Sequence, residues 1–203
     1  MIKNNTGITL KHLYDAKNYA FNLLGKLDDS LIYHKREFTT DLVYSSSLEI
    51  ARLENLSLEE KIQLGIAASF YNTNFLKTVI PNKLISAKFA QDYMDVSICK
   101  YSQKDRNIIL NSIIGNTEGS KLVLLFSKIL QDANNSVLGL ENFVELNLDL
   151  MKESQFYEDS IFHEISHNKE RWFTYIFPFF SKEHDWLTQG ARKLYQEMKE
   201  KNL

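Results

Sequence analysis

The chain has 203 residues, of which 44% are hydrophobic and 25% are charged. This composition is ordinary for a folded globular protein and excludes an intrinsically disordered one. The formal net charge of -2 excludes the strong basic excess that nucleic acids and anionic membranes attract, so we expect neither of them as a partner.

Apolar residues recur at helical spacing along the chain, which has only two prolines and seven glycines to interrupt them. The pattern predicts an all-α fold. In chain order, the expected helices run through residues 10–27, 42–53, 58–70, 85–93, 103–113 and 122–129, with two or three more over 140–201. The stretch 71–81 is expected to be a loop, and the segment 115–119, with a glycine at each end, is expected to break the chain again.

Two serines mark helix starts. Ser57 is followed at the third position by Glu60, the arrangement of a capping box, in which the hydroxyl and the carboxylate each accept a backbone N–H of the first turn. Ser102 precedes another helical pattern in the same way. Both serines therefore predict a helix that begins at the next residue.

The cellular compartment is predicted from cysteine usage and from apolar runs. The single cysteine, Cys99, allows no internal disulfide and fits a reducing compartment. The first residues have no apolar core of a signal peptide, and no apolar run reaches the roughly 18 residues of a membrane span. We therefore expect a cytoplasmic protein.

Four segments between residues 31 and 139 carry a family resemblance. They read LIYHKREFTTDLV, LSLEEKIQLGIAASFYNTNF, ISAKFA and LQDANNSVLG. In this order and spacing the chain resembles the HD superfamily of metal-dependent phosphohydrolases, in the branch that reads YHNxxHTxxV, LSxEE and AAxFHDxGF, HExxSAxxA and DADLxxLG. Near the C-terminus, Trp172 and the segment WLTQGARKL also resemble that branch.

The resemblance implies one domain over residues 1–203, an HD-like helical bundle with additional C-terminal helices. Residues 1–30 would form a leading helix, and residues 31–139 would form the HD-like core. Residues 140–203 would supply C-terminal helices that pack on this core, so a boundary near residue 140 would separate subdomains in contact.

The resemblance also assigns the positions of a metal site. In the family a histidine, a His-Asp pair and a distant aspartate hold one or two divalent metals, which activate a water molecule and neutralise phosphate oxygens. Here Asp132 matches a ligand, but the second aspartate of that motif is Asn134. The other ligand positions, including an auxiliary histidine, are replaced by Phe38, Tyr71, Asn72 and Asn82.

One carboxylate and two amides are too few donors to hold a catalytic divalent metal. We therefore expect a pseudoenzyme without metal or other cofactor, which acts as a regulatory module or binds a small molecule such as a nucleotide. The first alternative is an active phosphohydrolase that uses Mn, Mg or Fe on a nucleotide or another phosphoester. The second is a structural or oligomerising protein whose pocket is filled. If Phe38, Tyr71, Asn72 and Asn82 occupy the ligand positions, their side chains should converge near Asp132.

Four residues near these positions are candidates to bind a small phosphorylated ligand. They are His34, Arg36, Lys77 and Asp132. Each has an ordinary alternative: His34 could hydrogen-bond a neighbouring loop, Asp132 could pair with Arg36, and Lys77 could be solvated.

A second motif competes with the first. Residues 163–167 spell HExxH, which on a helix places His163 and His167 on one face with Glu164 between them, as in zinc proteases. The extension that supplies a third ligand in one such class is absent, because Glu170 and Phe173 stand in its glycine and histidine positions. We therefore expect an exposed polar helix face that binds no stoichiometric zinc.

Aromatic residues concentrate near the C-terminus. The cluster comprises Trp172, Phe173, Tyr175, Phe177, Phe179, Phe180 and Trp186. Such clusters usually belong to a core, but aromatics are also enriched in interfaces. We therefore expect a homodimer that associates through the C-terminal third.

Overall fold

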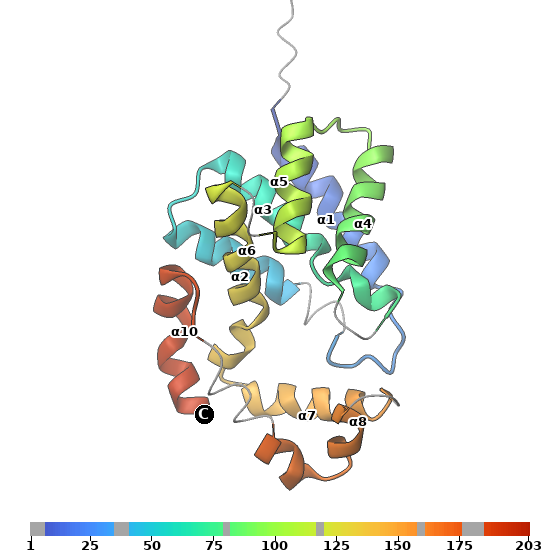
Figure 1. Ribbon diagram of the computed structural model, residues 1–203, viewed down its shortest axis with the longest axis vertical. Coiled ribbons are helices and arrows are strands. Elements are labelled where there is room, and N and C mark those ends of the chain that lie inside the picture. Colours follow the sequence, from blue (N-terminus) through green and yellow to red (C-terminus); the bar gives the residue numbers. More distant parts are fainter. Residues whose placement is uncertain (1–6, 35–40, 79–81, 117–119, 158–160, 176–184) are drawn as a thin grey trace, which may run out of the picture.

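The computed structural model describes residues 7–34, 41–78, 82–116, 120–157, 161–175 and 185–203. Over these ranges the chain is helical and has no strand, which confirms the all-α prediction (Figure 1). The longer helices are α1 (Leu10–Leu24), α2 (Asp41–Leu53), α3 (Leu58–Phe70), α4 (Lys83–Val96), α5 (Gln103–Ile114), α6 (Lys121–Asn134), α7 (Phe143–Ser154) and α10 (Gln189–Asn202). Shorter turns are η2 (Thr73–Leu76), η3 (Ser136–Gly139), α8 (Ile161–Ser166) and a helical segment over 169–175.

Both predicted helix starts are confirmed. At α3 the backbone N–H of Ser57 donates to Glu60 Oε2 at 2.8 Å, and the N–H of Glu60 donates to the Ser57 hydroxyl at 3.3 Å. At α5 the hydroxyl of Ser102 accepts the N–H of Asp105 at 3.1 Å. The same helix ends at Gly115, whose φ of 79° is the left-handed conformation that glycine adopts at helix ends.

Several boundaries differ from the expectations. Helix α1 ends at Leu24, and residues 25–27 form turns beyond it. The expected loop after α3 contains η2, which is held by side chains: the Ser86 hydroxyl accepts the N–H of Asn74 at 3.1 Å and donates to its Oδ1 at 3.2 Å. The described residues after 140 hold four helical segments where two or three were expected. Short segments of this kind are poorly marked by apolar periodicity alone.

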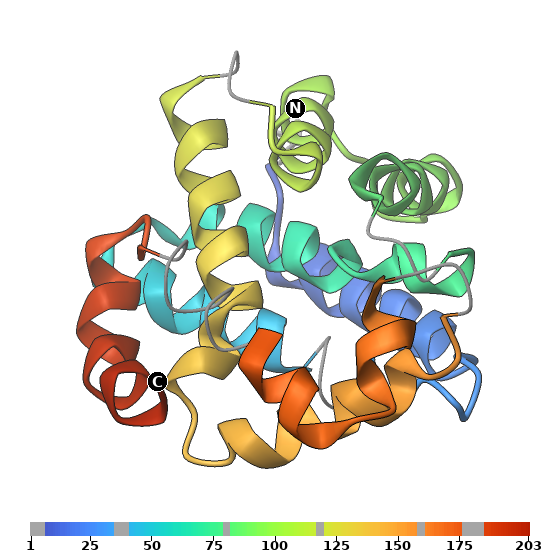
Figure 2. The same cartoon turned by 60° about the horizontal axis from the view of Figure 1, so that its bottom comes forward.

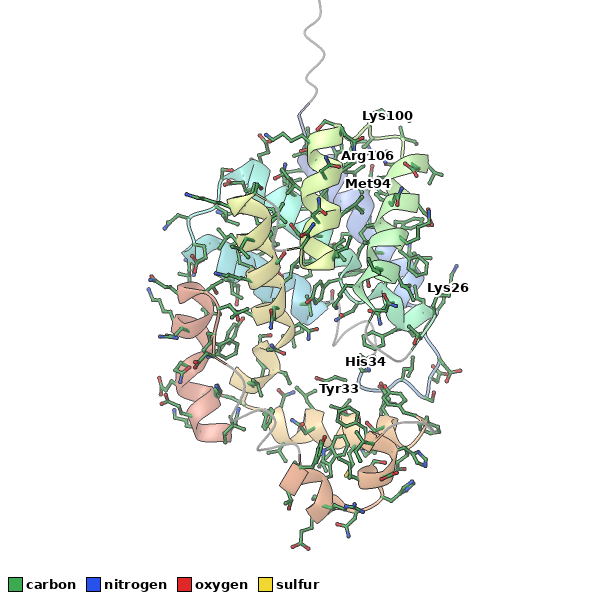
Figure 3. The ribbon with its side chains drawn as sticks, in the orientation of Figure 1. Lys26, Tyr33, His34, Met94, Lys100 and Arg106 are labelled. Atoms are coloured by element: carbon green, nitrogen blue, oxygen red, sulfur yellow. The ribbon has the colours of Figure 1, made fainter. Side chains whose placement is uncertain are left out.

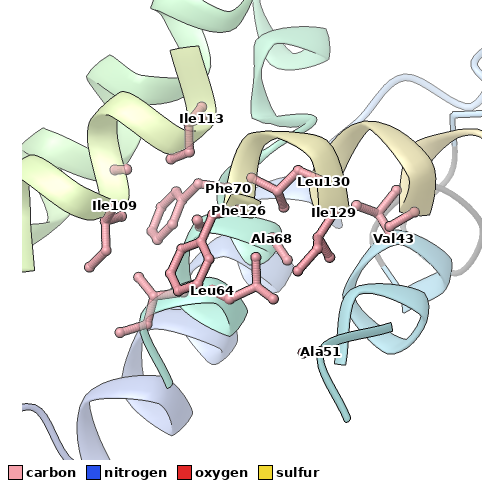
Figure 4. Packing of buried hydrophobic residues seen from close by; sticks show 14 of the residues in the cluster. Val43, Ala51, Leu64, Ala68, Phe70, Ile109, Ile113, Phe126, Ile129 and Leu130 are labelled. Carbon is pink, nitrogen blue, oxygen red and sulfur yellow. The ribbon is translucent and has the colours of Figure 1, made fainter. Parts of the chain in front are cut away.

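Helix α3 lies at the centre of the main core. It packs against α1, α2 and α5, and its Leu64, Ile66 and Phe70 have no exposed surface. Figure 4 shows side chains of α3 beside Phe126 of α6 and Ile109 of α5. Burying side chains of this size stabilises the fold by about 1.5–3 kcal/mol each.

The C-terminal helices divide between two clusters. Helices α7 and α8 lie together at one end of the molecule (Figures 1 and 2). There Trp172 and Ile165 form a small separate cluster that includes Phe162. Helix α10 instead packs on α2, α6 and η3, and Trp186 joins the main core just before it. Among the described residues, no helix is both long and apolar enough to cross a membrane.

Candidate functional site

Lys83, the first residue of α4, reaches back to the end of α3. Its Nζ donates to the carbonyl oxygen of Tyr71 at 3.0 Å and to Oδ1 of Asn72 at 3.1 Å. The same nitrogen lies 3.3 Å from the centre of the Tyr71 ring. Asn72 in turn donates its Nδ2 to Oδ1 of Asn134, at the end of α6, at 3.3 Å. We call these four residues, Lys83, Tyr71, Asn72 and Asn134, the Lys83 cluster.

The charge of Lys83 has no acidic counterpart in the part of the chain that the structure describes. Its hydrogen-bond acceptors are a carbonyl and an amide oxygen, which are neutral. Burial lowers the pKa of Lys83 to about 7, and burial also raises the pKa of the neighbouring Tyr71 to about 12. At neutral pH the cluster therefore holds a mixture of ammonium and free amine beside a neutral phenol.

Asp132 and Asn134 lie two positions apart on α6 and bind different partners. Asn134 joins the Lys83 cluster, whereas the carboxylate of Asp132 accepts the N–H of Leu187 at 2.9 Å and that of Thr188 at 2.8 Å. The Thr188 hydroxyl also donates to it, at 2.7 Å. Burial raises the pKa of Asp132 above its ordinary value, and it outweighs the hydrogen bonds from Leu187 and Thr188, which lower it. Asp132 thus fixes the start of α10.

A second buried carboxylate, Glu153 of α7, holds the segment that contains His34. Its Oε2 accepts the backbone N–H of Tyr33 at 2.7 Å and that of His34 at 2.9 Å. Its Oε1 contacts both Nδ1 of His34 and the hydroxyl of Tyr157. Figure 3 shows Tyr33 and His34 between the main helices and α7.

The electrostatics of Glu153 favour its ionised form. Burial works to raise its pKa, but the hydrogen bonds from His34 and Tyr157 and the charge of His34 outweigh burial, so the pKa lies below its ordinary value. An ionised carboxylate only accepts hydrogen bonds, so Nδ1 of His34 carries a proton. The His34 ring also lies on the ring of Phe75, a residue of η2, with 3.8 Å between the ring centres. His34 therefore connects α7 to the segment that follows Asn72.

The remaining candidate positions are placed as follows. The side chain of Asn82 caps α4, and its Oδ1 accepts the N–H of Leu84 at 3.1 Å and that of Ile85 at 3.4 Å. Lys77 and Asn82 line an open groove of about 400 Å³ along α4. Arg36 and Phe38 lie outside the described residues.

The HExxH motif begins on α8 and ends one residue beyond it, at His167. The rings of His163 and His167 lie edge to face with 4.9 Å between their centres. Nδ1 of His163 is buried, and no hydrogen-bond partner for it is seen within the described ranges. Within the same ranges, no three His, Cys, Asp or Glu residues are grouped so that they could hold a metal ion.

Two residues of these sites were missed by sequence analysis. Lys83 stands at a helix start, where a lysine is normally solvated, and only the packing of Tyr71 against it reveals its environment. Glu153 is one polar residue of an amphipathic helix, and nothing in its neighbourhood along the chain marks it as buried. No family model, curated protein sequence or solved structure matches the chain.

Proposed function

We propose that the chain is a degenerate HD-like domain that binds a small phosphorylated ligand, such as a nucleotide, and does not hydrolyse it. The observation that carries this proposal is the position of the Lys83 amine. It contacts Tyr71 and Asn72, the two residues that the resemblance assigns to the metal-binding His-Asp pair of the family. On this assignment, a protein amine contacts two of the positions that hold a metal ion in the family, while a third, Asp132, binds Thr188 instead.

The motif HExxSAxxA adds a second reason. If Asn82 stands in the position of its histidine, Lys83 stands in that of its glutamate. An acidic position has then become basic, beside an aspartate position that has become the neutral Asn72. Both changes make the site less favourable for a divalent cation and more favourable for an anion.

The chemistry of the Lys83 cluster suits a phosphate group. An ammonium and amide N–H groups are donors that phosphate oxygens accept, and hydrogen bonds to a charged group are stronger than neutral ones. Lys83 keeps part of its surface exposed, and Asn134 is exposed. The Lys83 cluster is therefore not closed off from solvent.

Calorimetric titration with inorganic phosphate and with a nucleoside monophosphate tests the proposal. We expect Lys83→Met to weaken binding about tenfold or more, because a charge-assisted hydrogen bond is lost, and Lys83→Arg to retain most of it. Lys88→Met is the matched control on α4, since Lys88 is exposed and pairs with Asp92 at 2.7 Å. Equal binding by the Lys83→Met variant and the native protein, or phosphatase activity with manganese, contradicts the proposal.

We further propose that the domain is a cytoplasmic homodimer that associates through its C-terminal third. Support for the dimer comes from apolar residues that are exposed in this part of the chain: Val144, Phe156, Ile161 and Tyr175. Support for the compartment comes from Cys99, a buried free thiol. Light scattering at high micromolar concentration tests the dimer, and a monomeric mass contradicts it.

A further inference from the structure

We propose that the outer face of α4 is a contact surface for a second copy of this chain, which packs on it antiparallel about a twofold axis at position 90. The surface is distinct from the C-terminal one, because α4 lies at one side of the molecule whereas α7 and α8 lie at its lower end (Figure 1). Two features carry the proposal: the order of the exposed side chains along α4, and the groove beside them.

Four exposed residues form a stripe along α4 at intervals of four positions. They are Leu84, Lys88, Asp92 and Val96, and residues four apart are neighbours on a helix surface. The two ends of the stripe are apolar, yet Leu84 is 66% and Val96 is 76% exposed. Between them, Lys88 and Asp92 form an exposed ion pair at 2.7 Å. Helix α4 packs against α3, α5 and η2, and the stripe stays uncovered.

The stripe is complementary to its own antiparallel copy. A contact about a twofold axis brings residue i of one copy to residue j of the other, and j to i. Leu84 and Val96 lie six positions before and after position 90, and Lys88 and Asp92 lie two positions before and after it. Leu84 therefore meets the partner's Val96, and Lys88 meets the partner's Asp92. Apolar faces apolar, and each charge faces its opposite. Rows of residues four apart also pack into each other in the commonest class of helix pairs.

The groove along α4 gives the partner's apolar side chains a place to pack. This open groove of about 400 Å³ borders the stripe, and its lining adds Ile85 and Phe89 to Leu84. In the antiparallel arrangement the partner's Val96 lies at the Leu84 end of the groove. Ile98, which is 91% exposed just beyond the end of α4, follows it there. The contact thus removes the two most exposed of these apolar side chains from water.

We expect the dimer to be weak. Helix α4 has 14 residues, so it is about 21 Å long. A single pair of helices of this length buries less surface than the roughly 1,200 Å² of a standard stable interface. Association should therefore be measurable at high micromolar concentration and not at nanomolar concentration.

Sedimentation equilibrium at high micromolar concentration tests the charge pairing. Lys88→Glu places an acidic side chain opposite the partner's Asp92 twice in each dimer, so we expect the dissociation constant to rise about tenfold or more. The double variant Lys88→Glu with Asp92→Lys exchanges the two charges and should restore the dimer. Leu84→Asp should weaken it, and Leu10→Asp is the matched control, since Leu10 is 61% exposed on α1. Unchanged affinity in Lys88→Glu, or no rescue by the double variant, overturns the proposal.

A cross-link tests the antiparallel register. Within one chain, positions 84 and 96 are twelve residues apart, or about 18 Å along the helix, which is too far for a disulfide. A chain with both Leu84→Cys and Val96→Cys, and with Cys99→Ser to remove the native thiol, should give a disulfide-linked dimer on oxidation. Each single cysteine variant should stay uncrosslinked. No dimer from the double variant, or equal dimer from the single variants, contradicts the register.

A variant of the C-terminal surface separates this contact from the dimer proposed above. Val144→Asp changes that surface and should leave the cross-link through α4 unchanged. If both contacts form, the native mass exceeds that of a dimer, and either Val144→Asp or Lys88→Glu reduces it to a dimer. Association that is lost in Val144→Asp and persists in Lys88→Glu overturns the α4 contact alone. The reverse result overturns the C-terminal contact alone, and a monomeric native protein at high micromolar concentration contradicts both.

Discussion

Thr188 donates both its backbone N–H and its hydroxyl to the same oxygen of Asp132, at 2.8 and 2.7 Å. Thr188 is the N-cap of α10, and its hydroxyl also accepts the N–H of Ala191 at 3.2 Å. The carboxylate that the resemblance assigns to a metal is therefore bound to the start of a helix more than fifty residues later in the chain. If the carboxylate of Asp132 bound a metal instead of these donors, the start of α10 would lose its hydrogen bonds to α6.

We expect Asp132→Asn to lower the free energy of unfolding by about 1–3 kcal/mol, because an amide nitrogen cannot accept the bonds from Thr188 or Leu187. Urea unfolding at pH 7 measures this. Asp149→Asn is the control, since Asp149 forms a surface pair with Lys152, and we expect a change within about 0.5 kcal/mol. An equal loss of unfolding free energy in both variants contradicts the role of Asp132 at the start of α10. The folded pKa of Asp132 is raised, so the part of its contribution that depends on protonation is lost as pH rises from the ordinary value of 3.8 through the folded pKa, while the hydrogen bonds from Thr188 and Leu187 remain. The deficit of the variant should therefore be larger below pH 3.8 than at pH 7.

The contribution of Glu153 to stability has the opposite pH dependence. Its folded pKa is depressed, so its stabilisation is present above its ordinary value of 4.5 and is lost as pH falls through the folded pKa. Glu153→Gln should lower the free energy of unfolding by about 2 kcal/mol at pH 7. It should also flatten the loss of stability under acid conditions. Thermal unfolding between pH 3 and 7 measures both effects, with the exposed Glu145→Gln on the same helix as control. Parallel curves for the Glu153→Gln variant and the native protein would count against this role.

Gly139 is expected to tolerate no side chain. A Cβ at this position would lie 2.5 Å from Cβ and 2.9 Å from Cα of Tyr195, so η3 and α10 would have to move apart. We expect Gly139→Ala to destabilise the fold by about 1–3 kcal/mol. At Gly7 an added Cβ meets nothing within 4 Å, so Gly7→Ala is the matched control. Denaturant midpoints compare the two, and similar midpoints would show that η3 and α10 can separate at little cost.

The histidine pair at the end of α8 should not hold zinc at an equimolar level. Only two imidazoles meet there, and the described residues bring no third His, Cys, Asp or Glu near them. Zinc sites need three or four protein ligands. Metal analysis of protein purified without a histidine tag measures the content. Equimolar zinc that disappears in His163→Ala contradicts this prediction.

The all-α fold and, to within two residues, the starts of the helices from α1 to α6 follow from the sequence alone. Apolar spacing and capping act within one or two turns, so Ser57 with Glu60 and Ser102 predict their helices from neighbouring residues. Because these signals are local, sequence analysis overestimates the length of α1 and misses η2. The end of α1 is marked only by an exposed turn, and η2 depends on Ser86, a residue of another helix.

The chemistry of the sites depends on the tertiary structure. Whether an ionisable side chain is solvated, paired or buried depends on contacts with residues that are distant in the chain. Lys83 contacts Tyr71, which lies on the other side of a turn. Asp132 is bound by Thr188 of α10, and Glu153 is bound by His34, which lies near the other end of the chain. Local patterns give the type of each residue, and only the packing of the helices decides its dielectric surroundings and its partners.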